Sequence, residues 1–566
     1  ADLARLPAVS RAMRDAVAVT GLRFEELGED DAAHLGCLSA LQRLQRGGRL
    51  SRRDYLCQAA ARSGQLEELK VLRANGSPWN KWTCCCAALG GHLDVMQWLR
   101  ANWYPWDEET CLGAAGGGHL ELLQWARANG CPWDKRTCHA AAEVGHLEVL
   151  QWACANGCPC DEKQLHIAAG MGHEAVVRAL IEAGADVNKA MDNGATPLYA
   201  AAQEGQGTMV RALIESGADI NKANDMGGKP LSIAAQNGHE TVVRALIESG
   251  ADVNKAKYIG ATPLCIAAQN GHETIVRALI EAGANVNMPR DEGVTPLFIA
   301  AEGHESIVRA LIEAGADVNQ ARDDGGTPLC IAAQEGHEVI VRALIEAGAD
   351  INKEKDDGLT PLNVAAKNGH EVIVRALIEA GADINKEKDD GLTPLHFAAG
   401  MGQEAVLRAL IEAGADVNKA DDYGVTPMYI TSHQGQGTIV RALIEVGADI
   451  NKSDDNGVTP LCAAAQNGHE AVVRALFEAD VNKANDMGVT PLFMAAENGH
   501  ETIVRALIEA GADVNQATEE GDTPLYIAAQ DGREAVMRAL IQAGADINKA
   551  TEEGDTPLSA SPTFEI

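Results

Sequence analysis

The sequence has no apolar run of 18 residues and no signal peptide at its start. A membrane-spanning helix needs about 20 mostly apolar residues, so we expect no membrane insertion. Positive charge is also scarce, because 47 Lys and Arg stand against 81 Asp and Glu, for a formal net charge of −34. Such a charge repels nucleic acids and anionic membranes. We therefore expect no nucleic-acid binding and a protein partner with a basic or neutral surface.

Motifs of common catalytic and nucleotide-binding sites are missing as well. Gly227-Gly228-Lys229 is followed by Pro230 and is not a phosphate-binding loop, and no Gly-x-Ser-x-Gly occurs. A His-Glu pair recurs, as at His173-Glu174, but the zinc-protease motif needs a second His where Val177 stands. We expect no catalytic residue, no metal and no cofactor, so the chain is predicted not to be an enzyme.

Charge and cysteine both divide the chain near residue 160. Residues 1–160 hold 17 Lys and Arg and 18 Asp and Glu, which leaves 30 basic and 63 acidic residues for residues 161–566. Eleven of the 14 Cys precede residue 161, which is typical of free thiols in a reducing compartment. We expect an intracellular, cytoplasmic protein. The chain begins at Ala1, which leaves open a targeting segment upstream.

A repeat dominates the sequence. Thr-Pro pairs recur from Thr196 to Thr556 in steps of 33 residues, with steps of 32 and 31 ending at Thr327 and Thr490, and Lys229 fills the one gap. A fixed step of this size is typical of a solenoid. Thr is a good helix N-cap and Pro suits the first helical position. A second apolar stripe ends at Gly184, which predicts a second helix with a left-handed cap.

The pattern T-P-L-x-x-A-A-x-x-G-H-E, followed by V-R-A-L-I-E-A-G-A-D-V-N, resembles the ankyrin repeat over about three quarters of the chain. The resemblance implies an all-α solenoid of stacked helix–turn–helix units. It also implies protein recognition through the concave face of the stack. In ankyrin repeats the segment between units, here residues 185–195, is a β-hairpin finger, and the recurring His is structural.

Three parts are predicted along the chain. Residues 1–56 form an N-terminal helical segment, residues 57–165 form 27-residue repeats that resemble short Trp-rich ankyrin variants, and residues 166–566 form regular repeats with a truncated last unit. Six residues of each short repeat are missing where the finger would be. We therefore expect β-hairpin fingers only in the C-terminal block.

Two interpretations of the first residues stay open. Asp2–Val17 resembles the second half of an F-box, with an apolar stripe from Leu3 to Val17, although the first half of that motif is absent. This resemblance implies an alternative function, a substrate-recruiting subunit of a cullin ubiquitin ligase. The other interpretation is an N-terminal capping helix that covers the end of the solenoid.

Cysteine and tryptophan form columns in the short repeats. The Cys column replaces the Leu of Thr-Pro-Leu and is predicted to be buried, whereas Cys131, Cys154, Cys158 and Cys160 form the only plausible zinc cluster, without the usual spacing. The Trp columns are predicted to be core that replaces the fingers, and the alternative is a partner-binding strip. The columns are Cys57, Cys84, Cys111 and Cys138; Trp98, Trp125 and Trp152; and Trp79, Trp106 and Trp133.

Comparison of the units with one another singles out the positions that vary. Capping and apolar positions hardly change, whereas the finger tips and the residue after Thr-Pro-Leu do. In ankyrin repeats these positions line the groove that binds partners. The hypothesis is a non-catalytic protein–protein interaction scaffold of undetermined oligomeric state. Its candidate partner-binding residues are Met191, Asn193, Tyr199, Tyr258, Ile259, Phe298, Tyr423, Tyr429, Met487, Phe493 and Tyr526.

Overall fold

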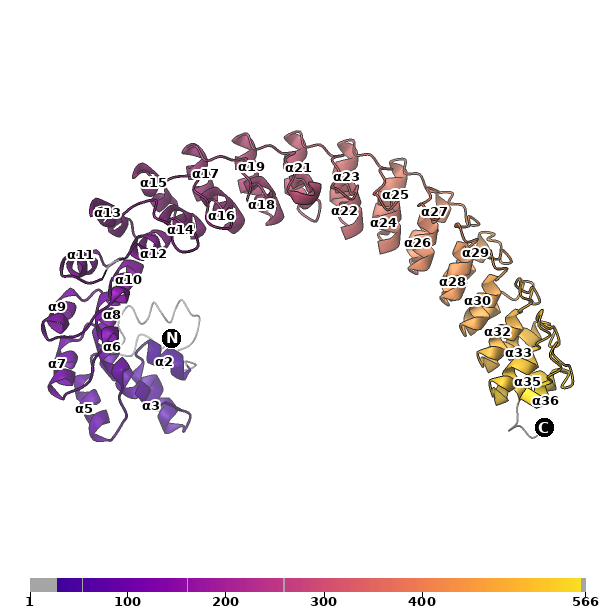
Figure 1. Cartoon of the computed structure of the whole chain (residues 1–566), viewed down its shortest axis with the longest axis horizontal. Helices are drawn as coiled ribbons and strands as arrows, with labels where there is room; N and C mark the ends of the chain where they lie inside the picture. The colour runs from indigo at the N-terminus through magenta and orange to yellow at the C-terminus, as the bar shows by residue number, and fades with distance from the viewer. Residues whose placement is uncertain (1–27, 53, 160, 258–259, 561–566) are drawn as a thin grey trace, which may run out of the picture. The chain divides into compact units, whose positions relative to one another are not determined.

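The computed structural model describes residues 28–52, 54–159, 161–257 and 260–560. These residues are helical, with turns and loops between the helices, and none of them forms a β-strand. The contacts divide the chain into two compact units, Ala1–Ala284 and Asn285–Ile566. In each unit the helices come in pairs, and the first helices of the pairs form one row beside a row of second helices (Figure 1).

The first unit begins with two helices that precede the regular pairs. Its helices are α2 (Glu29–His34), α3 (Leu38–Arg46), α4 (Asp54–Arg62), α5 (Leu66–Ala74), α6 (Lys81–Leu89), α7 (Leu93–Ala101), α8 (Glu108–Gly116), α9 (Leu120–Ala128), α10 (Lys135–Val144), α11 (Leu147–Ala155), α12 (Lys163–Met171), α13 (Glu174–Glu182), α14 (Pro197–Gln203), α15 (Gly207–Glu215), α16 (Pro230–Asn237), α17 (Glu240–Glu248), α18 (Pro263–Gln269) and α19 (Glu273–Glu281).

The second unit continues the same pairing and ends with a short first helix. Its helices are η2 (Asp291–Gly293), α20 (Pro296–Ala300), α21 (Glu305–Glu313), α22 (Pro328–Glu335), α23 (Glu338–Glu346), α24 (Pro361–Asn368), α25 (Glu371–Glu379), α26 (Pro394–Gly400), α27 (Glu404–Glu412), α28 (Pro427–His433), α29 (Gly437–Glu445), α30 (Pro460–Gln466), α31 (Glu470–Ala475), α32 (Pro491–Glu497), α33 (Glu501–Glu509), α34 (Pro524–Gln530), α35 (Glu534–Gln542) and α36 (Pro557–Ala560).

Capping residues set where the first helices begin. Thr196 Oγ1 accepts a hydrogen bond from the Tyr199 N–H at 3.1 Å, and Pro197 occupies the first turn of α14. Lys229, at the gap in the Thr series, makes no such side-chain cap. In the short repeats an Asn or Asp takes over the role, as Asp107 does when it accepts from the Glu109 N–H at 3.1 Å. The predicted helix starts are therefore confirmed at the Thr-Pro pairs.

The core lies between the two rows of helices. On α14, Leu198, Ala201 and Ala202 are fully buried, and the two short Ala side chains allow α12 and α16 to pack closely on either side. On α15, Val210 and Leu213 are fully buried beneath them. Each such Val or Leu contributes about 1.5–3 kcal/mol of burial free energy, so the stack is stabilised repeat by repeat.

The predicted β-hairpin fingers are not found among the described residues, and tight turns stand in their place. The Met191 N–H donates to Ala195 O at 2.8 Å, but Met191 O accepts from the Gly194 N–H and the Ala195 N–H donates to Asn193 Oδ1 instead. The return bond that would complete a strand bridge is therefore missing. The next turn adds a single backbone bond, from the Asp225 N–H to Asn193 O at 3.1 Å. We call residues 191–195 and the equivalent segment of each regular repeat a finger turn.

Asn and His side chains tie neighbouring repeats together. Asn352 Oδ1 accepts from the Asp383 N–H of the next repeat at 2.9 Å. His370 Nε2 lies 2.9 Å from Gln334 O of the preceding repeat. Both contacts recur along the regular repeats, as at Asn385 Oδ1 with the Asp416 N–H, 2.9 Å apart. The recurring His thus makes a repeat-to-repeat contact, in keeping with a structural role.

The described stack begins with α2. Residues Asp2–Val17, which resemble an F-box, lie outside the described residues, so both interpretations of that stretch stay predictions. Further on, α2 packs against α3 and α4 at the start of the described stack. Among the helices described, none is long and apolar enough to cross a membrane.

Candidate functional site

The structure places the predicted partner-binding residues in three different environments. At finger turns lie Met191, Asn193, Tyr423 and Met487, of which all but Met191 are exposed. On first helices lie the half-buried Tyr199, Tyr429 and Tyr526. Tyr258 and Ile259 lie outside the described residues. Phe298 and Phe493 are only 4% and 7% exposed, so their rings belong to the core and offer a partner little surface.

Within each of the two units, the residues that precede the Gly of the finger turns form what we call the tip column of that unit. The members of the two columns include three exposed apolar side chains, Met226, Tyr423 and Met487, which are 70%, 69% and 64% exposed. Met226 was missed by sequence reasoning, although its place before Gly227 matches that of Tyr423 before Gly424. Large apolar side chains with this exposure are candidates for interface anchors.

Ion pairs hold the acidic part of the tip column in the second unit. Asp324 pairs with Arg322, and Asp390 Oδ2 lies 2.7 Å from Lys388 Nζ. The hydrogen bond from the Arg322 guanidinium lowers the pKa of Asp324 to about 2. These pairs are partly exposed, so each is worth little to stability, but they set the direction in which each carboxylate points.

A cavity of about 100 Å³ opens beside these finger turns in the second unit. The Arg322 guanidinium lies 5.3 Å from the centre of the Phe298 ring at one wall. Gly326 and Cys330 leave space there because their side chains are small. The lining of the cavity consists of Phe298, Arg322, Asp324, Gly326, Cys330, Ile331, Gln334, Lys355 and Val364.

Several second helices, such as α23 and α25, carry two Glu and one Arg. Arg375 on α25 pairs with Glu371 of the same helix at 3.0 Å and with Glu412 of the next repeat at 3.1 Å. One Arg of α25 therefore serves two Glu, and the helix itself carries a net negative charge. By contrast, α29, α31 and α35 each hold one Arg and one Glu, so most of the acidic excess of the second unit lies in its loops and turns.

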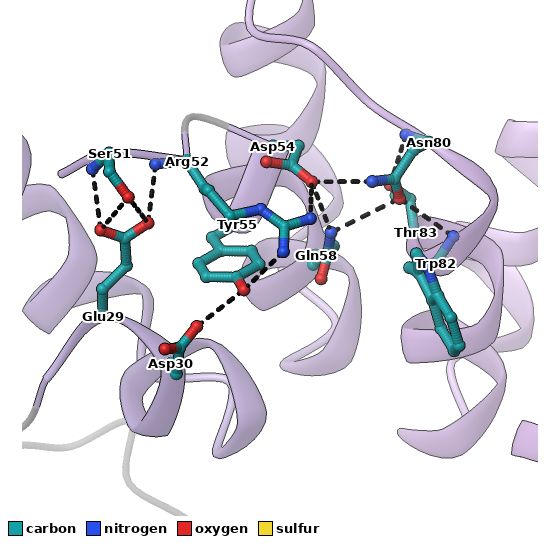
Figure 2. Close-up of polar contacts among 10 residues, drawn as sticks. All are labelled: Glu29, Asp30, Ser51, Arg52, Asp54, Tyr55, Gln58, Asn80, Trp82 and Thr83. Carbon is teal, nitrogen blue, oxygen red and sulfur yellow. Dashed lines mark hydrogen bonds and ion pairs between the residues drawn. The ribbon is translucent and has the colours of Figure 1, made fainter.

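A polar cluster at the start of the described chain anchors α2 to the first helix pair (Figure 2). Glu29 accepts hydrogen bonds from the backbone N–H groups of Ser51 and Arg52 at 2.7 and 2.6 Å. Tyr55 Oη donates to Asp30 at 2.7 Å. These acceptors and donors satisfy one another, so this part of the cluster acts as a structural anchor.

The cluster continues from α4 to α6 through Asp54 (Figure 2). Asp54 Oδ2 accepts from Gln58 Nε2 at 3.0 Å and from Asn80 Nδ2 at 2.7 Å. The same link between neighbouring first helices recurs further along, where Lys81 pairs with Asp107 at 3.2 Å. Side chains thus connect the short repeats at the helix ends where finger turns connect the regular ones.

The Trp columns form one packed pair in each of three short repeats. The ring centres of Trp79 and Trp98 lie 6.0 Å apart, and those of Trp106 and Trp125 lie 5.8 Å apart. These four rings are half-buried. The rings pack against one another, but they are half-buried and are not part of the buried core that was predicted for them. Trp103 belongs to neither column.

The Cys column is buried, as expected. Burial raises the pKa of the Cys57 thiol to about 11, which suppresses the reactive thiolate. Cys131 Sγ donates to Asp107 O at 3.5 Å, so this thiol takes part in a contact between repeats. No three His, Cys, Asp or Glu side chains are placed to hold a metal ion in the part of the chain that is described, and Cys160 lies outside it.

His396 on α26 makes a pH-dependent contribution to its repeat. Its Nδ1 accepts from the Thr393 N–H at 3.1 Å, and its Nε2 lies 3.1 Å from Val425 O. This arrangement needs a neutral ring with the proton on Nε2. Burial lowers the pKa of His396 below its usual value of 6.5. The stability it contributes is therefore complete above pH 6.5 and is lost as the pH falls through the lower pKa of the folded state.

We expect hydrogen exchange in α26 to speed up as the pH falls below 6.5, after correction for intrinsic rates. The His396→Asn variant should lose this pH dependence, because Asn363 occupies the matching position of the preceding repeat and hydrogen bonds with Thr360 at 2.8 Å. An unchanged pH profile in the variant would show that another group causes the effect.

Comparison with protein families identifies the repeats. A family model described as ankyrin repeats (3 copies) matches residues 111–191, 165–257, 231–322, 319–388, 381–454 and 428–518. A model of the single ankyrin repeat matches residues 520–552. No curated protein matches the chain significantly. The family matches cover most of the chain and begin inside the short repeats.

Proposed function

The chain belongs to the ankyrin-repeat family and is a protein–protein interaction scaffold, and we propose that it is non-catalytic and binds its partners along the tip columns and the neighbouring first helices. The exposed tips Met226, Tyr423 and Met487 are the observation that carries this proposal. A partner that buries large apolar side chains such as these gains more binding free energy than one that buries small or polar side chains.

Charge supports a basic partner. Residues 161–566 hold 63 Asp and Glu against 30 Lys and Arg. In the second unit the tips Asp357 and Asp390 add carboxylates beside the apolar anchors. A cationic partner would be steered toward this surface, and its association rate would fall as salt is added. The cavity beside Phe298 would then take one side chain of the same partner.

Replacing Tyr423 and Met487 together with Ser is expected to weaken partner binding by about tenfold or more, because buried interface anchors carry most of the affinity. The thermal midpoint should stay unchanged, since both side chains are exposed. Partners can be recovered by proximity labelling, and their affinity for the purified full chain can then be measured by calorimetry at two salt concentrations.

The chain offers a matched control on its second helices. Val339 and Val372, on α23 and α25, are exposed apolar side chains that lie away from the finger turns. Their replacement with Ser also removes exposed apolar surface, although less of it, and should leave affinity unchanged. If this control weakens binding and the tip variant does not, the partner uses the second helices and the proposed surface is wrong.

A further inference from the structure

Trp103 differs from every other Trp of the chain. It lies in the loop after α7, and its side chain is 89% exposed. Its backbone has a φ of 59°, in the left-handed region that bulky residues rarely adopt. The side chain therefore combines an unfavourable backbone conformation with the exposure of a large apolar surface.

The equivalent loops of neighbouring repeats use Gly at this position. Gly76 and Gly130 follow α5 and α9 with φ values of 76° and 82°. The loops close alike, because the Tyr104 N–H donates to Leu99 O at 3.1 Å and the Cys131 N–H donates to Ala126 O at 3.0 Å. A Cβ at Gly76 or Gly130 would meet no atom within 4 Å. The position thus has room for a side chain but offers it nothing to pack against, so Trp103 does not stabilise the fold.

The loop that carries Trp103 is held at both ends. The Arg100 guanidinium lies 4.5 Å from the centre of the Trp106 ring. Tyr104 is buried, and its ring centre lies 4.4 Å from that of Trp79. The indole of Trp103 is therefore presented from a loop that needs little ordering when a partner binds, which lowers the entropic cost of association.

The loop of Trp103 and the equivalent loops of the neighbouring repeats carry no acidic residue, although the chain as a whole is strongly acidic. Segments 75–78, 102–105 and 129–132 contain no charged residue. Arg73, Arg100 and Arg127 lie in the last turns of α5, α7 and α9, whereas the acidic residues of these helices lie in their first turns. The next acidic residue after Trp103 along the chain, Asp107, is paired with Lys81 at 3.2 Å.

We propose that Trp103 and the exposed arginines Arg73 and Arg100 form a second docking surface, which binds an acidic protein segment that carries an apolar side chain. The indole would bury the apolar side chain, and the guanidinium groups would donate hydrogen bonds to the carboxylates of the segment. A nucleic acid also combines negative charge with flat apolar faces, but the net charge of −34 repels its phosphates. This surface and the tip column of the second unit carry opposite charge, so they take different partners.

The test uses the full chain and a fluorescein-labelled synthetic peptide of Glu and Asp with a central Leu-Phe pair. Fluorescence anisotropy should show binding of this peptide, and none of a peptide with Lys in place of each acid. Trp103→Gly should weaken binding by about tenfold or more. The thermal midpoint of Trp103→Gly should not fall, because the variant has the residue that the neighbouring repeats use. Arg100→Gln should weaken binding, whereas Trp82→Ala and Tyr423→Ser should leave it unchanged.

Several results would overturn the proposal. The proposal is wrong if the acidic peptide fails to bind at low salt, or if the Trp103→Gly variant binds the peptide as well as the parent chain does. A lowered midpoint in Trp103→Gly shows that Trp103 packs within the fold. Binding of an oligothymidylate in place of the peptide assigns the surface to nucleic acid. Self-association that Trp103→Gly abolishes, without peptide binding, assigns it to a second copy of the chain.

Discussion

Replacing Leu344 with Ala is expected to lower the free energy of unfolding of its repeat by about 2–5 kcal/mol. Leu344 lies on α23 and is fully buried between the two helix rows. The truncation removes burial and leaves a cavity that the close-packed neighbours can fill only in part. Hydrogen exchange measured repeat by repeat is the suitable method, since a long repeat array need not unfold in a single step.

The chain contains a matched test of this prediction. Residues 336–362 and 369–395 have the same sequence, so Leu377 on α25 repeats the surroundings of Leu344. Leu377→Ala should therefore cost about as much as Leu344→Ala, and both effects should fade within a repeat or two. Equal loss of protection at α29 would contradict nearest-neighbour stability. The exposed Val339→Ala is the control and should change stability by less than about 0.5 kcal/mol.

Gly391→Ala is expected to destabilise its finger turn by more than the strain of the backbone alone. Gly391 has a φ of 79°, and an added Cβ would lie 2.8 Å from the backbone N of Asp422 in the next finger turn. That contact would disrupt the bond from the Asp422 N–H to Asp390 O, which measures 3.1 Å. We expect a loss of about 2–3 kcal/mol, from strain of about 1–2 kcal/mol and a lost hydrogen bond of about 1 kcal/mol.

Gly381→Ala separates the two contributions. Gly381 follows α25 with a φ of 94°, but a Cβ there would meet no atom within 4 Å. The free energy of unfolding of this variant should therefore fall only by the backbone strain, about 1–2 kcal/mol. Hydrogen exchange of the amides of α25 and α26 in both variants measures the difference between the two losses of stability. Equal losses would mean that contact between finger turns adds nothing to stability.

Much of the fold was predictable because its determinants are local. Thr196 and Pro197 start α14 through a bond to a residue three positions away. The left-handed Gly that follows most second helices is equally local, as at Gly184 with a φ of 94°. A repeated local pattern needs no knowledge of distant contacts, so the helix pairs and their order follow from the sequence.

The finger turns and the candidate site were predicted less well. The prediction of strands was wrong because the Asn193 side chain accepts the hydrogen bond of the Ala195 N–H, which a strand bridge would use. The spacing of residues in the sequence does not reveal this competition. Phe298, Phe493 and Tyr199 occupy the same variable position of their repeats. The two Phe rings are buried, however, whereas Tyr199 is half-buried. Sequence variation therefore marked a column without distinguishing its exposed members from its core members.

The sequence by itself determined the family, the helix pairs, their caps and the acidic character of residues 161–566. Only the tertiary structure decided which varying residues reach solvent, because exposure depends on what the neighbouring repeat places against each side chain. Met226 and Trp103 illustrate the difference. The absence of Gly at position 103 is visible in the sequence, but only the packing of the loop shows that its side chain is 89% exposed and meets open space.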